Sequence, residues 1–194
     1  MNIIDWTSLT ELQRQQALAR PEQLSDPKLF ADVQAIIARV KQQGDQALLD
    51  YNRTFDGVDL GELAASEAEF EQAERELPDD IKDALQQAKQ RITRWHKAGM
   101  GKEFSVKTAP GVHCGRIIRP IQRVGLYIPA GSASLPSTVL MLGIPALLAN
   151  CPEVLMCTPA QKDGSVHPAI LVAARLCGIN KVYKTGGAQA IAAT

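Results

Sequence analysis

Residues 124–138 read VGLYIPAGSASLPST, and this stretch decides the fold. The apolar run from Val124 to Ile128 is typical of a buried strand, and it breaks at Pro129. A loop of small residues follows, and an apolar helix begins at about Thr138. A strand that leads through such a loop into a helix predicts a ligand-facing turn at one end of an α/β sheet.

The small side chains of residues 131–134 allow a ligand to approach the backbone closely. The helix N-terminus behind them favours an anion such as a phosphate. Four hydroxyls are available for phosphate binding or helix capping, and Ser137 is expected to be the cap. They belong to Ser132, Ser134, Ser137 and Thr138. The spacing is not that of the dinucleotide fingerprint, so it predicts a ligand loop without naming the ligand.

Strands and helices alternate from this point to the end of the chain. Strands are expected at 124–128, 153–157 and 181–184, and helices at 137–149, 166–177 and from 187 onward. This alternation predicts a parallel sheet with right-handed crossovers, and so an α/β fold. The chain ends inside its last helix, so the sheet is expected to keep an exposed edge.

The first hundred residues are helical in pattern. Residues 1–25 form an arm whose helix runs from Thr10 to Arg20 with a thin apolar stripe, which is typical of packing on another subunit or domain. A second helix begins at Pro27 and ends at Gly44, and Asp45 is expected to cap the next one. The residues from Ser66 to Glu69 fit a capping box that begins another helix.

A long helix is expected from Pro78 to about Lys97. Its inward-facing residues are expected to be Ile81, Leu85, Ala88, Ile92 and Trp95. Beyond it the apolar period changes from helical to two, which predicts a hairpin of strands 104–108 and 112–120 around the turn at 109–111.

Composition narrows the class of protein. The 194 residues are 45% hydrophobic and 22% charged, with no apolar run long enough for a membrane span. No secretory signal is visible, so a cytoplasmic location is expected. Residues 1–100 hold 12 basic and 18 acidic side chains, a net charge of −6, and residues 101–194 hold 9 and 3, a net charge of +6. The basic residues are scattered without interleaved aromatic residues, so no nucleic-acid partner is predicted.

The cysteines and histidines show no metal-ligand spacing. Cys114, Cys151, Cys157 and Cys177 are expected to be free thiols in the core. His96, His113 and His167 fit no zinc motif.

Two polar residues stand at the carboxyl ends of predicted strands, where open α/β sheets bind ligands. Tyr127 ends the strand at 124–128 and is either a nucleotide contact or an amphipathic residue packed at the sheet end. Gln189 follows the turn Gly186–Gly187 and is either a ligand contact or a solvent-facing residue after a tight turn.

The segment VGLYIPAGSASLPSTVLM at 124–141 resembles the signature of the histidinol dehydrogenase family. The block GGAQAIAA at 186–193 resembles a second motif of that family, and residues 3–6 and 43–48 resemble its N-terminal region. The likeness covers essentially the whole chain. It implies a homodimer with Rossmann-like domains related to aldehyde dehydrogenases, in which Tyr127 and Gln189 contact NAD.

The resemblance also implies an activity, the oxidation of L-histidinol to L-histidine with NAD and zinc. Members of the family are longer, and their zinc ligands and acid/base pair lie beyond Thr194. We therefore expect the N-terminal part of such an enzyme, inactive alone and without metal ligands or catalytic residues of its own. The expected parts are an arm at 1–25, the first part of one Rossmann-like domain at 26–123 and the incomplete start of a second at 124–194.

Two other hypotheses remain open. One is a catalytically dead module for NAD binding or protein interaction. The other is an aldehyde dehydrogenase-type NAD(P) oxidoreductase with a nucleophilic cysteine, for which Cys151 and Cys157 are the candidates because they flank a predicted strand.

Overall fold

The computed structural model describes residues 4–19, 27–129 and 134–194. The chain divides into two compact units, residues 1–34 and residues 35–194. Among the described residues, no helix has both the length and the apolar character that crossing a membrane requires.

The first unit is helical. It holds a 3-10 turn, Trp6–Ser8, the helix α1, Glu11–Leu18, and the beginning of α2, Pro27–Gln43. The Thr10 side chain caps α1 in a capping box with Gln13, which confirms the start of the predicted helix. No residue of α1 is buried.

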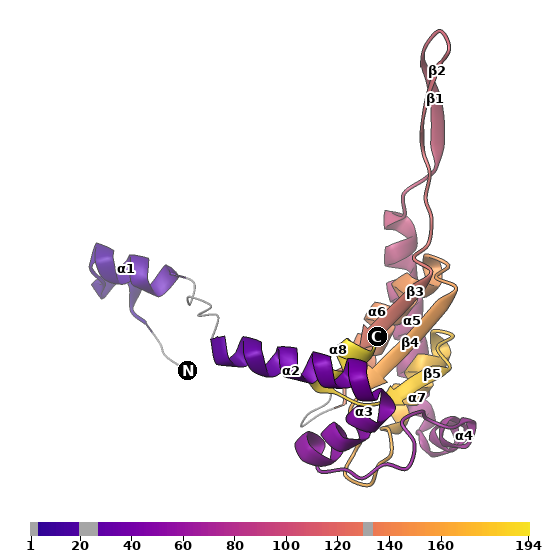
Figure 1. Cartoon of the computed structure of the whole chain (residues 1–194). Coiled ribbons are helices and arrows are strands. Elements are labelled where there is room, and N and C mark those ends of the chain that lie inside the picture. Colours follow the sequence, from indigo (N-terminus) through magenta and orange to yellow (C-terminus); the bar gives the residue numbers. More distant parts are fainter. Residues whose placement is uncertain (1–3, 20–26, 130–133) are drawn as a thin grey trace. The chain divides into compact units, whose positions relative to one another are not determined.

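The second unit contains a three-stranded parallel sheet in the order β3-β4-β5 (Figure 1). The strands are β3, Arg123–Tyr127, β4, Glu153–Thr158, and β5, Lys181–Lys184. In the register, Leu126 lies beside Met156 and Met156 beside Val182, so one face of the sheet is a row of buried apolar side chains. This arrangement confirms the predicted α/β, Rossmann-like parallel sheet.

Two layers of helices cover that apolar face. The inner helices are α6, Pro136–Leu148, and α7, Pro168–Leu176, which follow β3 and β4 in the chain. Against them pack α4, Glu67–Glu76, on α7, and α5, Asp79–Gly99, on both. Fully burying a side chain such as Ile144 stabilises the fold by about 1.5–3 kcal/mol, so this core is the main stabilising element.

The helices of residues 67–99 and the sheet from residue 123 onward therefore share one core. In this chain the segments on the two sides of residue 123 belong to the same compact unit. The division into Rossmann-like domains at 26–123 and 124–194 stays a prediction about a longer protein.

A second apolar cluster covers the opposite face of the sheet. It consists of Val40, Ala47, Leu48, Tyr51 and Leu63, with Tyr183 of β5 and Ala192 of α8 packed against it. Its helices are the end of α2, α3, Asp45–Tyr51, a π-helical turn, Asn52–Asp56, and α8, Gly187–Ala193.

One edge of the sheet is partly paired, although an exposed edge was expected. Ala65 donates its N–H to the Val182 carbonyl at 2.8 Å, and Lys184 donates to the Leu63 carbonyl at 2.7 Å. Residues 63–65 thus run antiparallel to β5, because Ala64 forms a bridge with Tyr183. Edge backbone groups paired in this way are not available to another chain.

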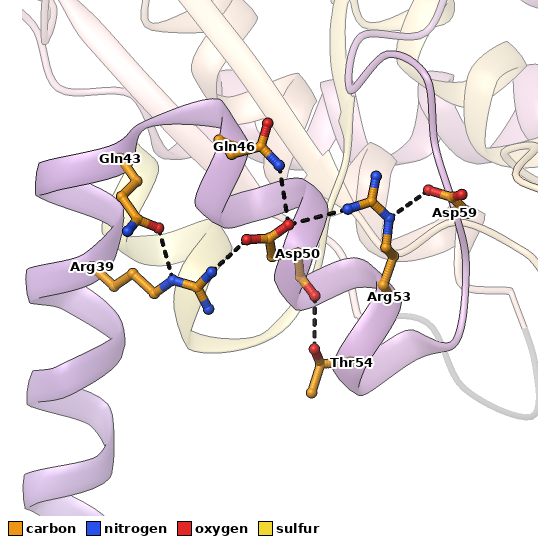
Figure 2. A network of polar contacts seen from close by, with 7 residues as sticks. All are labelled: Arg39, Gln43, Gln46, Asp50, Arg53, Thr54 and Asp59. Atoms are coloured by element: carbon orange, nitrogen blue, oxygen red, sulfur yellow. Dashed lines mark hydrogen bonds and ion pairs between the residues drawn. The ribbon is translucent and has the colours of Figure 1, made fainter.

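A polar network fastens α2 to α3 (Figure 2). Asp50 accepts hydrogen bonds from Arg39, from Gln46 at 3.0 Å and from Arg53 at 3.1 Å. Arg53 also pairs with Asp59 at 2.6 Å, and Arg39 lies over the Tyr51 ring. The network fixes the helices that immediately precede Asn52, a residue that contacts the end of β5.

The predicted hairpin forms, with a shorter second strand than expected. Strand β1, Phe104–Ala109, pairs antiparallel with β2, Val112–Arg116, and the expected extension to Pro120 is absent from the described structure. Every residue of both strands is exposed.

The prediction for the inward face of α5 is wrong at both ends. Leu85 is buried and Ala88 and Ile92 pack on the core, but Ile81 is 41% and Trp95 is 78% exposed. A helical apolar stripe shows which residues share a face, whereas the length of the neighbouring helices decides how much of it is covered.

Two predicted caps are also wrong. Leu135 occupies the N-cap position of α6 and Pro136 follows as its first residue, so Ser137 lies inside the helix. Gly44 occupies the N-cap position of α3, and Asp45 lies in the first turn. The capping box of Ser66 and Glu69 at the start of α4 is confirmed.

Candidate functional site

The candidate site lies at the carboxyl ends of β3, β4 and β5. Open α/β sheets bind ligands outside these strand ends, because the loops that connect strands to helices converge there. Tyr127 ends β3, Pro159 follows β4, and the turn of Thr185, Gly186 and Gly187 follows β5. Residues 130–133 of the predicted ligand loop lie outside the described residues.

Tyr127 is tied to the turn after β5. Its hydroxyl oxygen accepts a hydrogen bond from the Gly187 backbone N–H at 3.2 Å. The two outer strands of the sheet are therefore linked at their carboxyl ends, across the end of β4. The hydroxyl hydrogen of Tyr127 has no acceptor among the described residues, so it can be donated to a ligand.

The turn itself requires two glycines. Gly187 has a φ of +65°, and a Cβ there would lie 2.7 Å from Oε1 of Gln189. A Cβ on Gly186 would lie 2.4 Å from Cγ of Pro159. Side chains at these positions would force the turn away from its neighbours, and at Gly187 also into a strained backbone conformation.

Gln189 is 2% exposed, so the alternative of a solvent-facing residue is wrong. Its side-chain oxygen packs against Gly187, the residue whose N–H bonds to Tyr127. The structure thus brings both predicted site residues to one turn. Their role as NAD contacts stays a prediction.

Sequence reasoning missed two buried polar residues beside the turn. The Thr185 hydroxyl is buried without a hydrogen-bond partner in the described structure, and so is the side-chain oxygen of Asn52. Asn52 donates its amide to the Lys184 carbonyl at 2.7 Å. Unpaired buried polar groups cost about 1–3 kcal/mol each, so they are found where a water or a ligand completes them.

A cavity of about 240 Å³ lies next to Thr185, on the face of the sheet that carries Cys157 and Tyr183. Its remaining wall is formed by Asp45, Leu48, Leu63, Leu155, Ala193 and Thr194. Thr185 therefore lines a recess of the molecule, although its hydroxyl oxygen is itself buried.

The cysteines are free thiols, as predicted, but only two are in the core. Burial raises the pKa of Cys157 to about 11, and it does the same for Cys177. Cys114 is exposed, because the hairpin that carries it is uncovered, and Cys151 is half-buried. A buried thiol with a raised pKa is a poor nucleophile, so Cys157 does not suit covalent catalysis.

A partly buried ion pair joins α4 to β5. Nζ of Lys184 lies 3.2 Å from Oε1 of Glu69, and the Lys184 side chain is only 10% exposed. Burial raises the pKa of Glu69, but hydrogen bonds from Ser66 and Lys184 outweigh it, so the pKa lies below its ordinary value. No local sequence pattern indicates this pair, since the two residues are 115 positions apart.

Zinc does not fit the part of the chain that the structure describes. No group of three or more histidine, cysteine, aspartate or glutamate side chains there could hold a metal ion. His167 instead caps α7, where its Nδ1 accepts from the Ala169 N–H at 3.2 Å. His96 lies in the last turn of α5, and His113 lies in β2.

A family model described as histidinol dehydrogenase matches residues 18–194. The chain belongs to the histidinol dehydrogenase family. It is 54% identical over 193 residues to the histidinol dehydrogenase of Xanthomonas campestris and 49% identical to that of Xylella fastidiosa. Each of these alignments covers all of this chain and 45% of the relative.

A solved histidinol dehydrogenase has the same fold. The crystal structure of the enzyme from Elizabethkingia anophelis superposes with a TM-score of 0.88 at 38% identity, over 95% of this chain and 42% of that one. The chain thus spans somewhat less than half the length of the family members that it matches. The activity of the whole enzyme is therefore a proposal for this chain.

Proposed function

We propose that this chain is the N-terminal part of a histidinol dehydrogenase, which oxidises L-histidinol to L-histidine through the aldehyde in histidine biosynthesis, with NAD and zinc. The observation that carries the proposal is the strand-end turn. There Tyr127 and Gln189 both contact Gly187. The family model matches residues 18–194, which include all three strands of the sheet.

The turn fits a nucleotide because it combines a free donor with an orphaned buried hydroxyl. Tyr127 and Gln189 would hold NAD, which accepts hydride from the substrate when it is bound. The Tyr127 hydroxyl would donate to the nucleotide, since its own acceptor position is already used by Gly187. The Gln189 amide would orient the nucleotide by donating or accepting a hydrogen bond.

The zinc ligands and the acid/base pair are assigned to a part of the enzyme outside these 194 residues. The described residues offer no suitable ligand set, so no step of the reaction is assigned to a metal held by this chain. A homodimer is part of the proposal, because the family is expected to be dimeric. A cytoplasmic location is proposed from the biosynthetic role.

The burial of Cys157 favours this proposal over an aldehyde dehydrogenase-type mechanism. Such a mechanism needs an accessible thiolate at the site, whereas Cys157 is 3% exposed with a pKa of about 11. Cys151 precedes β4 and so lies at the amino end of that strand, away from the strand ends that form the site. The alternative of a catalytically dead binding module is distinguished from the enzyme by the activity of the full-length protein.

The test compares the isolated 194-residue chain with the full-length enzyme that contains it. NADH formation from L-histidinol and zinc content after exhaustive dialysis are measured for both. We expect turnover and stoichiometric zinc in the full-length enzyme only. Turnover by the isolated chain at the rate of the full-length enzyme, or stoichiometric zinc on it, would contradict the assignment of catalytic residues. An inactive full-length protein would favour the dead module.

A further inference from the structure

We propose that Tyr127 is a positioning residue, whose hydroxyl fixes the Gly186–Gly187 turn and through it the Gln189 amide. The inference rests on the proposed function, because the Gln189 amide matters here as a nucleotide contact. Under this inference, the orientation of Gln189 depends on Tyr127, so one predicted nucleotide contact depends on the other.

The Gly186–Gly187 turn is held by contacts to the ends of the two other strands. Gly186 packs against the Pro159 ring, which belongs to the segment after β4. Gly187 donates its N–H to Tyr127 at the end of β3. The turn after β5 is thus restrained by contacts to the ends of both other strands, and the Tyr127 bond is the polar one.

Gln189 is held by its packing against Gly187. The space against Gly187 that its Oε1 occupies exists only because Gly187 lacks a side chain. Its amide makes no hydrogen bond within the described parts of the chain, although the residue is 2% exposed. Packing against the turn is therefore what sets the orientation of the amide, and a shift of Gly187 moves the surface on which it rests.

The Tyr127 hydroxyl has two hydrogen-bonding roles. A tyrosine hydroxyl accepts and donates at the same time, so Tyr127 can hold Gly187 and still bind a ligand. Tyr127→Phe keeps the ring and its packing but removes the bond to Gly187. The variant therefore separates positioning of the turn from the aromatic contact.

Hydrogen exchange of the unliganded full-length enzyme tests the bond directly. We expect the peptide that contains the Gly187 amide to exchange about 2- to 13-fold faster in Tyr127→Phe, the range for loss of one neutral hydrogen bond. Tyr51→Phe is the matched control, because its hydroxyl makes no hydrogen bond within the described residues and its ring lies in the second apolar cluster. Unchanged exchange in Tyr127→Phe would overturn the inference.

Calorimetric NAD affinities of Tyr127→Phe, Gln189→Ala and the double variant test the dependence. We expect the double variant to bind NAD no more than about twofold more weakly than Tyr127→Phe, because loss of the Tyr127 hydroxyl already removes both its own bond to the nucleotide and the orientation of the Gln189 amide. Losses that multiply would show two independent contacts, which overturns the inference and leaves the proposed function intact. Unchanged affinity in both single variants would instead overturn the proposed nucleotide site.

Discussion

At the scale of single residues, sequence position predicted that Tyr127 and Gln189 lie at the strand ends, but it did not predict their surroundings. Tyr127 ends β3 and Gln189 follows β5, and the structure places both against Gly187. Asn52 escaped prediction because its partner, the Lys184 carbonyl, is 132 positions away. A contact of that kind depends on packing of the α3 segment on β5, which local sequence does not show.

The thiols give a prediction at the same scale. Cys157 has a pKa of about 11, so at pH 8 only about one molecule in a thousand carries the thiolate. Because the side chain is 3% exposed, that thiolate is also shielded from reagents in solution. We expect iodoacetamide to leave Cys157 unmodified in the native protein. The same protein in guanidinium chloride, where the thiol is free, is the control. Rapid alkylation of native Cys157 would revive the covalent-catalysis hypothesis.

At the scale of elements, periodicity and capping predicted most boundaries. The capping box of Ser66 identified the start of α4, and the strand-helix alternation identified β3 to α8. Burial was less predictable, as the exposed Trp95 of α5 shows. Whether a residue of α5 is buried depends on which neighbouring helices extend as far as that residue, and no local sequence pattern contains that information.

The pair of Glu69 and Lys184, which joins α4 to β5, predicts a pH effect. The pKa of Glu69 is lowered on folding, so its contribution to stability is present above the unfolded pKa and is lost as the pH falls through the folded pKa. We expect the urea midpoint of unfolding to fall below about pH 4.5 and to fall less steeply in Glu69→Gln. Glu62→Gln is the control, because this exposed carboxylate makes no hydrogen bond or ion pair with the described residues. Equal slopes in Glu69→Gln and the unaltered protein would contradict the role of this pair.

At the scale of the whole molecule, the parallel sheet was predictable from the sequence, but the pairing of residues 63–65 along its edge was not. The alternation of strands and helices predicts the layer of α6 and α7, because crossovers pack on the sheet that they connect. The antiparallel addition of residues 63–65 to β5 was hidden, since that segment has no strand pattern and pairs through three residues only. The sheet, the turn after β5 and the family together lead to one central claim, a nucleotide site at the strand ends.

The most direct test of that claim is the Michaelis constant for each substrate in Tyr127→Ala and Gln189→Ala variants of the full-length enzyme, with Gln90→Ala on the exposed surface of α5 as control. The constant for NAD should rise about 2- to 13-fold in Gln189→Ala, and further in Tyr127→Ala, which also loses an aromatic contact. The constant for histidinol should stay within about twofold, because no hydrogen bond to histidinol is assigned to either residue. A rise for histidinol without a rise for NAD would contradict the placement of the nucleotide, and no change in either constant would make Tyr127 and Gln189 purely structural.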